Sequence, residues 1–157
     1  MIVIARERIL DAPPDALWPL IADAARLPEW LDFGERVEPL GGTGLGRRLR
    51  LHGHWGDRQS EVDVIVVEED APRRLAWRHE AERLNHRPAP AFARETVFAI
   101  EVAPAGTGAR VRLESRQQPA TWLHGLMIRL MGSRLAGQAM QRSLRRLAAV
   151  ASVAAAS

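Results

Sequence analysis

The chain of 157 residues contains no cysteine, lysine or tyrosine. Without thiols it cannot form disulfides, zinc–thiolate centres or a cysteine nucleophile, and nothing points to an oxidising compartment. Without lysine, Schiff-base chemistry, covalent pyridoxal phosphate and the phosphate-binding lysine of nucleotide-binding loops are excluded. These absences remove several catalytic classes, and we expect no cofactor.

Long apolar runs are missing as well. No segment approaches the ~18 uninterrupted apolar residues of a membrane-spanning helix. The first ten residues, MIVIARERIL, carry charges at Arg6, Glu7 and Arg8, where a signal peptide needs an apolar core. We therefore expect no membrane span, no secretory leader and a cytoplasmic location.

Arginine supplies all 22 basic residues, which exceed the 19 acids by a formal charge of +3. From Pro119 onward the chain has arginines but no acid, and Arg142, Arg145 and Arg146 lie where they complement the dipole of a helix end. Because a basic stripe interleaved with exposed aromatic residues is missing, we expect no nucleic-acid partner.

The length suits one domain, which we assign to residues 1–151, with a frayed tail at 152–157. Residues 2–10 alternate as in a strand, and proline-punctuated helical patterns follow up to residue 30. Residues 45–117 then show a period of two, as in an antiparallel meander with one face in water. From Pro119 the period becomes helical. These patterns predict an α+β domain.

Three stretches strengthen this interpretation: APPDALWPLIADAARLPEW, VDVIVVEEDAPRRLAWRH and GTGARVRLES. Together with the terminal helix, they resemble the polyketide cyclase/dehydrase and lipid-transport family of the START-like, or SRPBCC, superfamily, over essentially the whole chain. The resemblance implies a helix-grip fold. In that fold a curved seven-stranded antiparallel sheet surrounds a long C-terminal helix, and two short helices lie between strands 1 and 2.

The resemblance also implies a cavity between the sheet and the last helix. We expect it to bind a small hydrophobic molecule: a lipid, a polyketide-like compound or an aromatic metabolite. Two alternatives stay open, a cyclase, dehydrase or aromatase acting on such a molecule and a non-catalytic protein-interaction module, because function does not follow from fold. A homodimer also stays open.

His79 is the candidate catalytic residue. It shares a strand face with Leu75 and Trp77, where a general base or a ligand hydrogen bond would lie. The competing interpretation is a histidine at a strand end that bonds to a nearby backbone group.

The remaining site candidates are apolar or weakly polar residues predicted to point inward. Trp55, Trp77 and Trp122 are expected to converge on one cavity, whereas Trp18 and Trp30 are expected to be structural. The full predicted ligand-binding set is Leu49, Leu51, Trp55, Val64, Leu75, Trp77, His79, Phe98, Leu113, Ser115, Trp122, Leu123, Leu126, Met127, Leu130 and Met131.

Two further features complete the sequence-based picture. His52 and His54 point the same way on a strand, but no third ligand accompanies them, so we expect no metal site. Residues 80–93 are longer than a tight hairpin needs and contain PAPAF, so we hypothesise that they form a lid over the pocket mouth.

Overall fold

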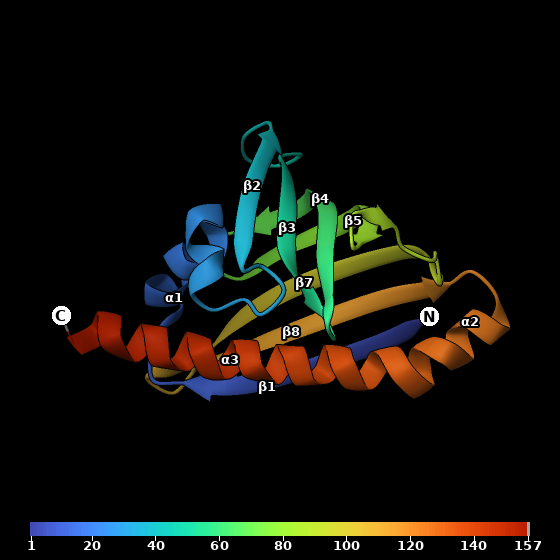
Figure 1. The fold of residues 1–157 in the computed structure, drawn as a ribbon. Coiled ribbons are helices and arrows are strands. Elements are labelled where there is room, and N and C mark those ends of the chain that lie inside the picture. Colours follow the sequence, from blue (N-terminus) through green and yellow to red (C-terminus); the bar gives the residue numbers. More distant parts are fainter. Residues whose placement is uncertain (157) are drawn as a thin grey trace.

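The computed structural model describes residues 1–156 and contains one curved antiparallel sheet gripping a long helical rod (Figure 1). Seven strands follow one another in the order β1-β8-β7-β5-β4-β3-β2, and the short β6 pairs with β5 alone. The strands are β1 (Ile2–Leu10), β2 (Arg36–Gly41), β3 (Arg48–Trp55), β4 (Arg58–Asp70), β5 (Arg74–Leu84), β6 (Arg87–Pro88), β7 (Ala93–Ala105) and β8 (Gly108–Pro119). The predicted α+β class and helix-grip architecture are confirmed.

Two short helices connect β1 to β2, as predicted: α1 (Pro14–Ala22) and the 3₁₀ helix η1 (Ala24–Glu29). Proline is well placed at the start of α1, because the first helical N–H groups have no intrahelical acceptor. The buried indole N–H of Trp30 donates to the carbonyl oxygen of Leu20 at 2.8 Å and so ties the end of η1 to α1. Trp30 is therefore a structural residue.

The C-terminal rod consists of α2 (Trp122–Met127), a π-helical turn η2 (Ile128–Gly132) and α3 (Ser133–Ala156). The Thr121 side chain accepts a hydrogen bond from the backbone N–H of His124 and caps α2. The wider π turn shifts the faces of α2 relative to those of α3. The helix continues to Ala156, through most of the segment expected to fray, and Ser157 lies outside the described residues.

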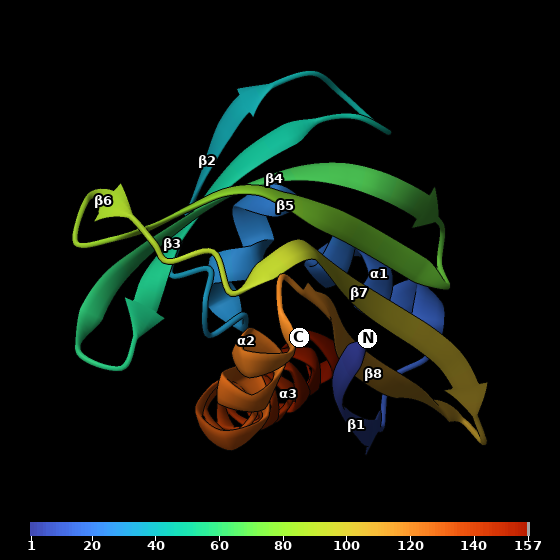
Figure 2. The ribbon, with the colours of Figure 1, turned by 90° about the vertical axis from the view of Figure 1, so that its right-hand side faces the viewer.

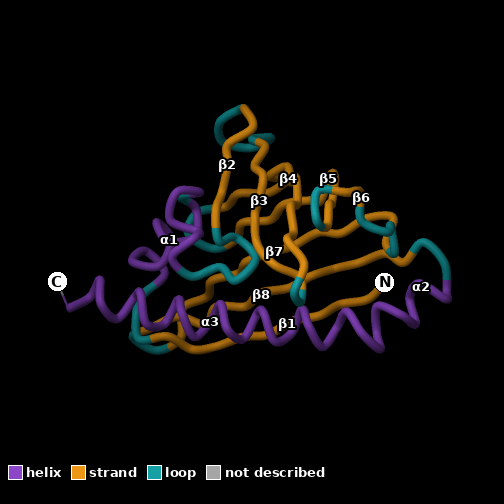
Figure 3. Tube along the Cα trace, in the orientation of Figure 1, coloured by secondary structure: helices purple, strands orange, loops and turns teal. Residues whose placement is uncertain are grey.

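The rod runs beside the edge strand β1, while the sheet arches over it to β2 on the far side (Figures 2 and 3). Ile128, Met140, Leu144 and Leu147 of the rod are buried against the sheet. On the other side of the rod, Arg142 and Arg146 form ion pairs with Asp32. These contacts hold the rod between β1 and the connection that follows η1. No helix within residues 1–156 is long and apolar enough to cross a membrane.

Candidate functional site

The inner face of the sheet, the face turned toward the rod, is assembled by strand register. Directly paired residues on adjacent strands share a face. One such row crosses five strands and is buried throughout: Ile4, Ser115, Phe98, Trp77 and Val66. A single hydroxyl thus lies in an otherwise apolar row.

The neighbouring row is interrupted. On one side Ile2 pairs with Gln117 and Gln117 with Thr96, and on the other side Val64 pairs with His79. The pairing of β5 with β7 ends at Arg78 and Val97, so Thr96 and His79 lie on opposite sides of a break in the sheet. Polar residues therefore stand on both sides of this break, Thr96 and Gln117 on one and His79 on the other.

A β-bulge brings an acid to the same place. Val64 pairs with His79 and Asp63 with Ala81, so β5 holds one residue more than β4. In a regular strand residues 79 and 82 would face opposite ways, but the extra residue turns Glu82 to the inner face opposite Val62. The His79 Nδ1 atom then lies 2.6 Å from Glu82 Oε1. We call His79, Glu82, Thr96, Ser115 and Gln117 the inner polar cluster.

The donor and the acceptor of the hydrogen bond between His79 and Glu82 can be assigned. The hydrogen bond from His79 lowers the pKa of the Glu82 carboxyl below its ordinary value, against the opposing effect of desolvation. An ionised carboxylate only accepts hydrogen bonds, so the proton between the two residues is on Nδ1. Nε2 of His79 has no hydrogen-bond partner within residues 1–156, and it stays available to another molecule.

Trp77 lies two residues before His79 on the same face. Its ring is fully buried and stacks on Phe98 with ring centres 5.1 Å apart, and Phe98 in turn meets the edge of Phe33. Unlike the indole of Trp30, the Trp77 Nε1–H group finds no acceptor in the described part of the chain. A buried donor of this kind is rare in folded proteins.

The predicted ligand-binding residues lie at four places in the structure. Seven pack in the core on the inner face: Leu49, Leu51, Val64, Leu75, Trp77, Phe98 and Leu113. His79 and Ser115 belong to the inner polar cluster, and Trp55 is exposed at the end of β3. Six lie exposed on α2 and η2: Trp122, Leu123, Leu126, Met127, Leu130 and Met131. Contact of these residues with a ligand stays a prediction.

The expected convergence of three tryptophans is wrong for Trp122. Its side chain lines a shallow surface groove of about 400 Å³ where α2 meets the start of β1, together with Met1, Pro119 and Arg129. Trp77 is enclosed on the inner face and does not line this groove. Helical periodicity could not show this, because apolar residues surround α2 on nearly every side.

The segment expected to form a lid is partly strand. Residues 80–84 continue β5, and Arg87 and Pro88 form β6. The Phe92 ring lies 5.5 Å from the ring of His124. The backbone carbonyl oxygen of Phe92 accepts a hydrogen bond from the Ala120 N–H group. The chain after β6 thus contacts the start of α2, and a lid function stays a prediction.

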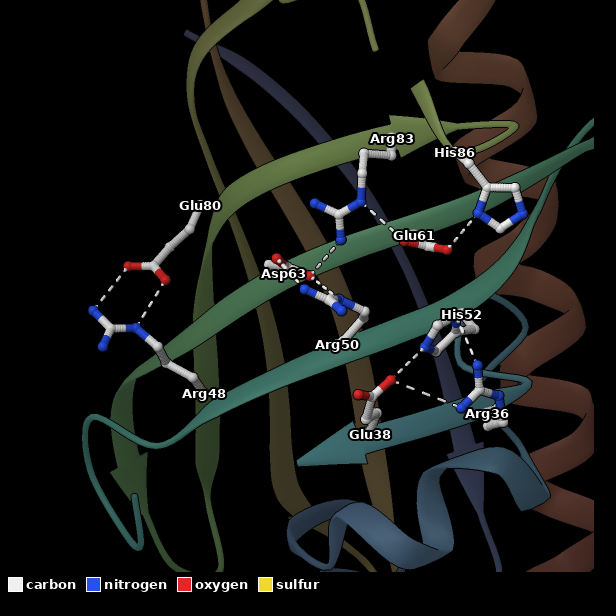
Figure 4. Close-up of polar contacts among 10 residues, drawn as sticks. All are labelled: Arg36, Glu38, Arg48, Arg50, His52, Glu61, Asp63, Glu80, Arg83 and His86. Carbon is white, nitrogen blue, oxygen red and sulfur yellow. Dashed lines mark hydrogen bonds and ion pairs between the residues drawn. The ribbon is translucent and has the colours of Figure 1, made fainter. Parts of the chain in front are cut away.

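The outer face of β2 to β5 carries ion pairs instead (Figure 4). Asp63 accepts hydrogen bonds from Arg50 and Arg83, and Arg83 also donates to Glu61. The two histidines of β3 are engaged here, His52 with Glu38 and His54 with Glu35. No cluster of three metal-ligating side chains occurs within residues 1–156.

Comparison with known families decides the relationship. Residues 1–152 match the family model described as polyketide cyclase / dehydrase and lipid transport. The chain belongs to this family. Among curated proteins, none matches the sequence.

Solved structures show the same fold. TTHA0849 from Thermus thermophilus is 20% identical with a TM-score of 0.77, and the match covers 99% of this chain and 100% of that one. A START superfamily protein from Mycobacterium smegmatis is 12% identical with a TM-score of 0.74, covering 96% and 97%. DynU16, a protein in the dynemicin biosynthetic locus, is 18% identical with a TM-score of 0.62, covering 93% of this chain and 45% of that one. At these identities the likeness concerns the fold alone.

Proposed function

We propose that the protein binds a small, largely apolar molecule that carries a hydrogen-bond acceptor, on the inner face between the sheet and the rod. The buried Trp77 N–H group is the observation that carries this proposal. A buried donor without an acceptor costs about 1–3 kcal/mol, and a carbonyl or hydroxyl oxygen of a ligand would recover that energy. The surrounding Phe98, Val66 and Val64 side chains suit an apolar ligand body.

The inner polar cluster supports the same function. Apolar binding sites use a few convergent polar groups to orient their ligands. Thr96, Gln117 and His79 supply such groups beside the break between β5 and β7, and Ser115 supplies one in the adjacent continuous row. Membership of a family described by polyketide cyclisation and lipid transport agrees with this ligand class.

The test compares ligands that differ only in the acceptor. The panel consists of bicyclic and tricyclic ketones, each beside its parent hydrocarbon, for example 1-tetralone and tetralin. We expect ketones to bind several-fold more tightly than hydrocarbons, because one net hydrogen bond is worth about 0.5–1.5 kcal/mol. Binding is measured by quenching of tryptophan fluorescence and by the rise in Tm.

The matched variant is Trp77→Phe, which keeps an aromatic ring but removes the donor. Trp77→Phe should bind a ketone and its parent hydrocarbon about equally. The control Trp18→Phe, a change in α1, should keep the preference for ketones. If no compound in the panel binds the wild type, or if the wild type shows no preference for the ketone, the proposal is wrong.

The His79–Glu82 pair favours a second candidate function, proton transfer as in a cyclase or dehydrase. Glu82 holds the imidazole so that Nε2 can accept a proton from a ligand C–H group next to a carbonyl. The electron pair of that C–H bond then forms the carbon–carbon double bond of an enolate, and the π electron pair of the carbonyl moves to its oxygen. Trp77 and His79 are two residues apart on one strand face, about 7 Å along the strand. A carbonyl group and its neighbouring carbon can bridge this separation.

Deuterium incorporation tests this candidate directly. The wild type in D₂O should accelerate exchange at the carbon next to the carbonyl of 1-tetralone, as followed by proton NMR. A general base contributes roughly 10²- to 10⁴-fold, so His79→Gln should return exchange to the uncatalysed rate, and Glu82→Gln should reduce it in part. Ketone binding without any accelerated exchange would leave the binding function standing and remove the catalytic one.

A further inference from the structure

The surface of the rod changes character at the π turn. Along α3 most exposed positions before its last two turns are polar, namely Arg134, Gln138, Gln141, Arg142, Arg145 and Arg146, whereas Leu135 and Val153 are exposed apolar residues that lie far apart on this helix. Along α2 and η2 only Gly125 and Ile128 are buried, and six of the other nine positions are exposed and apolar. A helix segment with so much apolar surface is normally buried, so this part of the rod is a candidate for contact with a partner.

The exposure is large. Trp122 is 81% exposed, Leu130 70% and Met131 66%, and the neighbouring Met1 is 71% exposed. Single exposed apolar residues are ordinary, but a contiguous group marks an interaction surface. We call the group Met1, Trp122, Leu123, Leu126, Leu130 and Met131 the apolar tip. It lies around α2, at one end of the rod (Figure 1).

The charge around the apolar tip is positive. Arg129 lies within it, Arg134 follows η2, and the Arg94 guanidinium donates to the carbonyl oxygen of Ala120 just before α2. No acid occurs from Pro119 onward. The start of β7, which pairs with the end of β8 just before α2, carries the acidic residue Glu95. Glu95 directly follows Arg94 in the chain.

We propose that the apolar tip docks on the surface of an anionic lipid bilayer. Trp122 and Leu130 would enter the boundary between head groups and acyl chains, where tryptophan is favoured, and Arg94, Arg129 and Arg134 would lie at the level of the phosphates. A second copy of the chain fits less well, because a self-complementary contact would bring like charges together. An anionic bilayer offers acyl chains to the apolar side chains and negatively charged phosphates to the basic ones.

Docking goes beyond the proposed function and does not depend on it. None of the side chains of the apolar tip belongs to the inner polar cluster, and the groove at Trp122 opens at the start of β1. Bilayer docking and binding of a small ketone can therefore be measured separately.

The experiment is vesicle sedimentation with the full chain. Vesicles of phosphatidylcholine alone are compared with vesicles that contain about one third phosphatidylglycerol. We expect binding to the anionic vesicles, weakened by added salt, and a blue shift of tryptophan emission. The double variant Trp122→Ala/Leu130→Ser should bind at least ten-fold more weakly, and Arg129→Gln/Arg134→Gln several-fold more weakly.

The controls are single substitutions of equally exposed side chains of the same types that lie elsewhere. Leu45→Ser, in the turn between β2 and β3, removes an equally exposed leucine, and Arg145→Gln removes an exposed arginine of α3. Both should bind like the wild type. Equal loss in controls and tip variants, or no sedimentation of the wild type, overturns the proposal. So does a concentration-dependent dimer in sedimentation velocity that the tip variants abolish, because the partner would then be a second copy.

Discussion

Nδ1 of His79 lies 2.6 Å from Oε1 of Glu82, although the two residues would face opposite ways in a regular strand. The β-bulge in β5 creates this contact, and bulges commonly re-aim side chains near functional sites. Both side chains remain partly accessible, 22% for His79 and 45% for Glu82, so the pair is open to another molecule as well as to water.

The titration of Glu82 tests this contact. The hydrogen bond from His79 lowers the pKa of Glu82 below its ordinary value of 4.5, so the carboxyl signal of Glu82 in carbon-13 NMR should titrate at lower pH than that of an ordinary glutamate. In His79→Gln the midpoint should move upward. A midpoint that does not respond to this substitution would show that the two side chains do not interact in solution.

The sequence allowed prediction of the faces of the strands but not of this pair. A period of two correctly assigns Leu49, Val64 and Trp77 to the inner face, because alternation depends only on the local chain. The position of Glu82 depends on the register between β4 and β5, since one unpaired residue reverses every later side chain. Nothing in the spacing of residues 80–84 reveals that shift.

The C-terminal rod shows a second limit of prediction from sequence. Its existence and length follow from periodicity, yet the direction of Trp122 does not, because a helix that is apolar all round has no unique buried face. The π turn after Met127 also moves the faces of α2 relative to α3. In the structure the side of α2 that meets the sheet is the one that carries Gly125, which lies against Pro119 and Ile2.

Removing residues 119–157 should abolish cooperative folding. The inner face would lose its buried partners Ile128, Met140, Leu144 and Leu147, each worth about 1.5–3 kcal/mol of burial, which together approach or exceed the usual stability of a domain. Circular dichroism during heating measures the effect. A truncated chain that still melts in a sharp transition would show that the rod is not part of the core.

Gly108 should tolerate no side chain. A Cβ atom there would overlap the carbonyl oxygen of Leu10 on the neighbouring strand, which is rigid backbone. We expect Gly108→Ala to destabilise the fold by about 1–3 kcal/mol, as overpacking does. Gly132→Ala is the matched control because its Cβ would make only an ordinary contact with Ile128. Equal urea midpoints for the two variants would contradict the expected overlap.

Asp63 should make stability depend on pH in the acid range. Its carboxyl accepts hydrogen bonds from Arg50 at 2.7 Å and Arg83 at 2.8 Å, is only 17% exposed, and has its pKa lowered, chiefly by Arg50, from 3.8 to about 2. The folded state therefore binds this proton less readily than the unfolded state. The resulting stabilisation is complete above pH 3.8 and is lost as the pH falls toward 2.

The same pKa values give the size of the contribution of Asp63 to the unfolding free energy. At about 1.4 kcal/mol per pH unit, the interval from 3.8 to about 2 corresponds to at most about 2–3 kcal/mol, reduced where water screens the arginines. Asp63→Asn should lower the unfolding free energy at pH 7, and its loss of stability on acidification should be smaller by this amount. Asp57→Asn, in the exposed turn between β3 and β4, should keep the wild-type pH dependence. Urea unfolding between pH 7 and pH 2 measures all three proteins, and parallel curves for Asp63→Asn and the wild type would show that the two arginines do not hold this carboxylate.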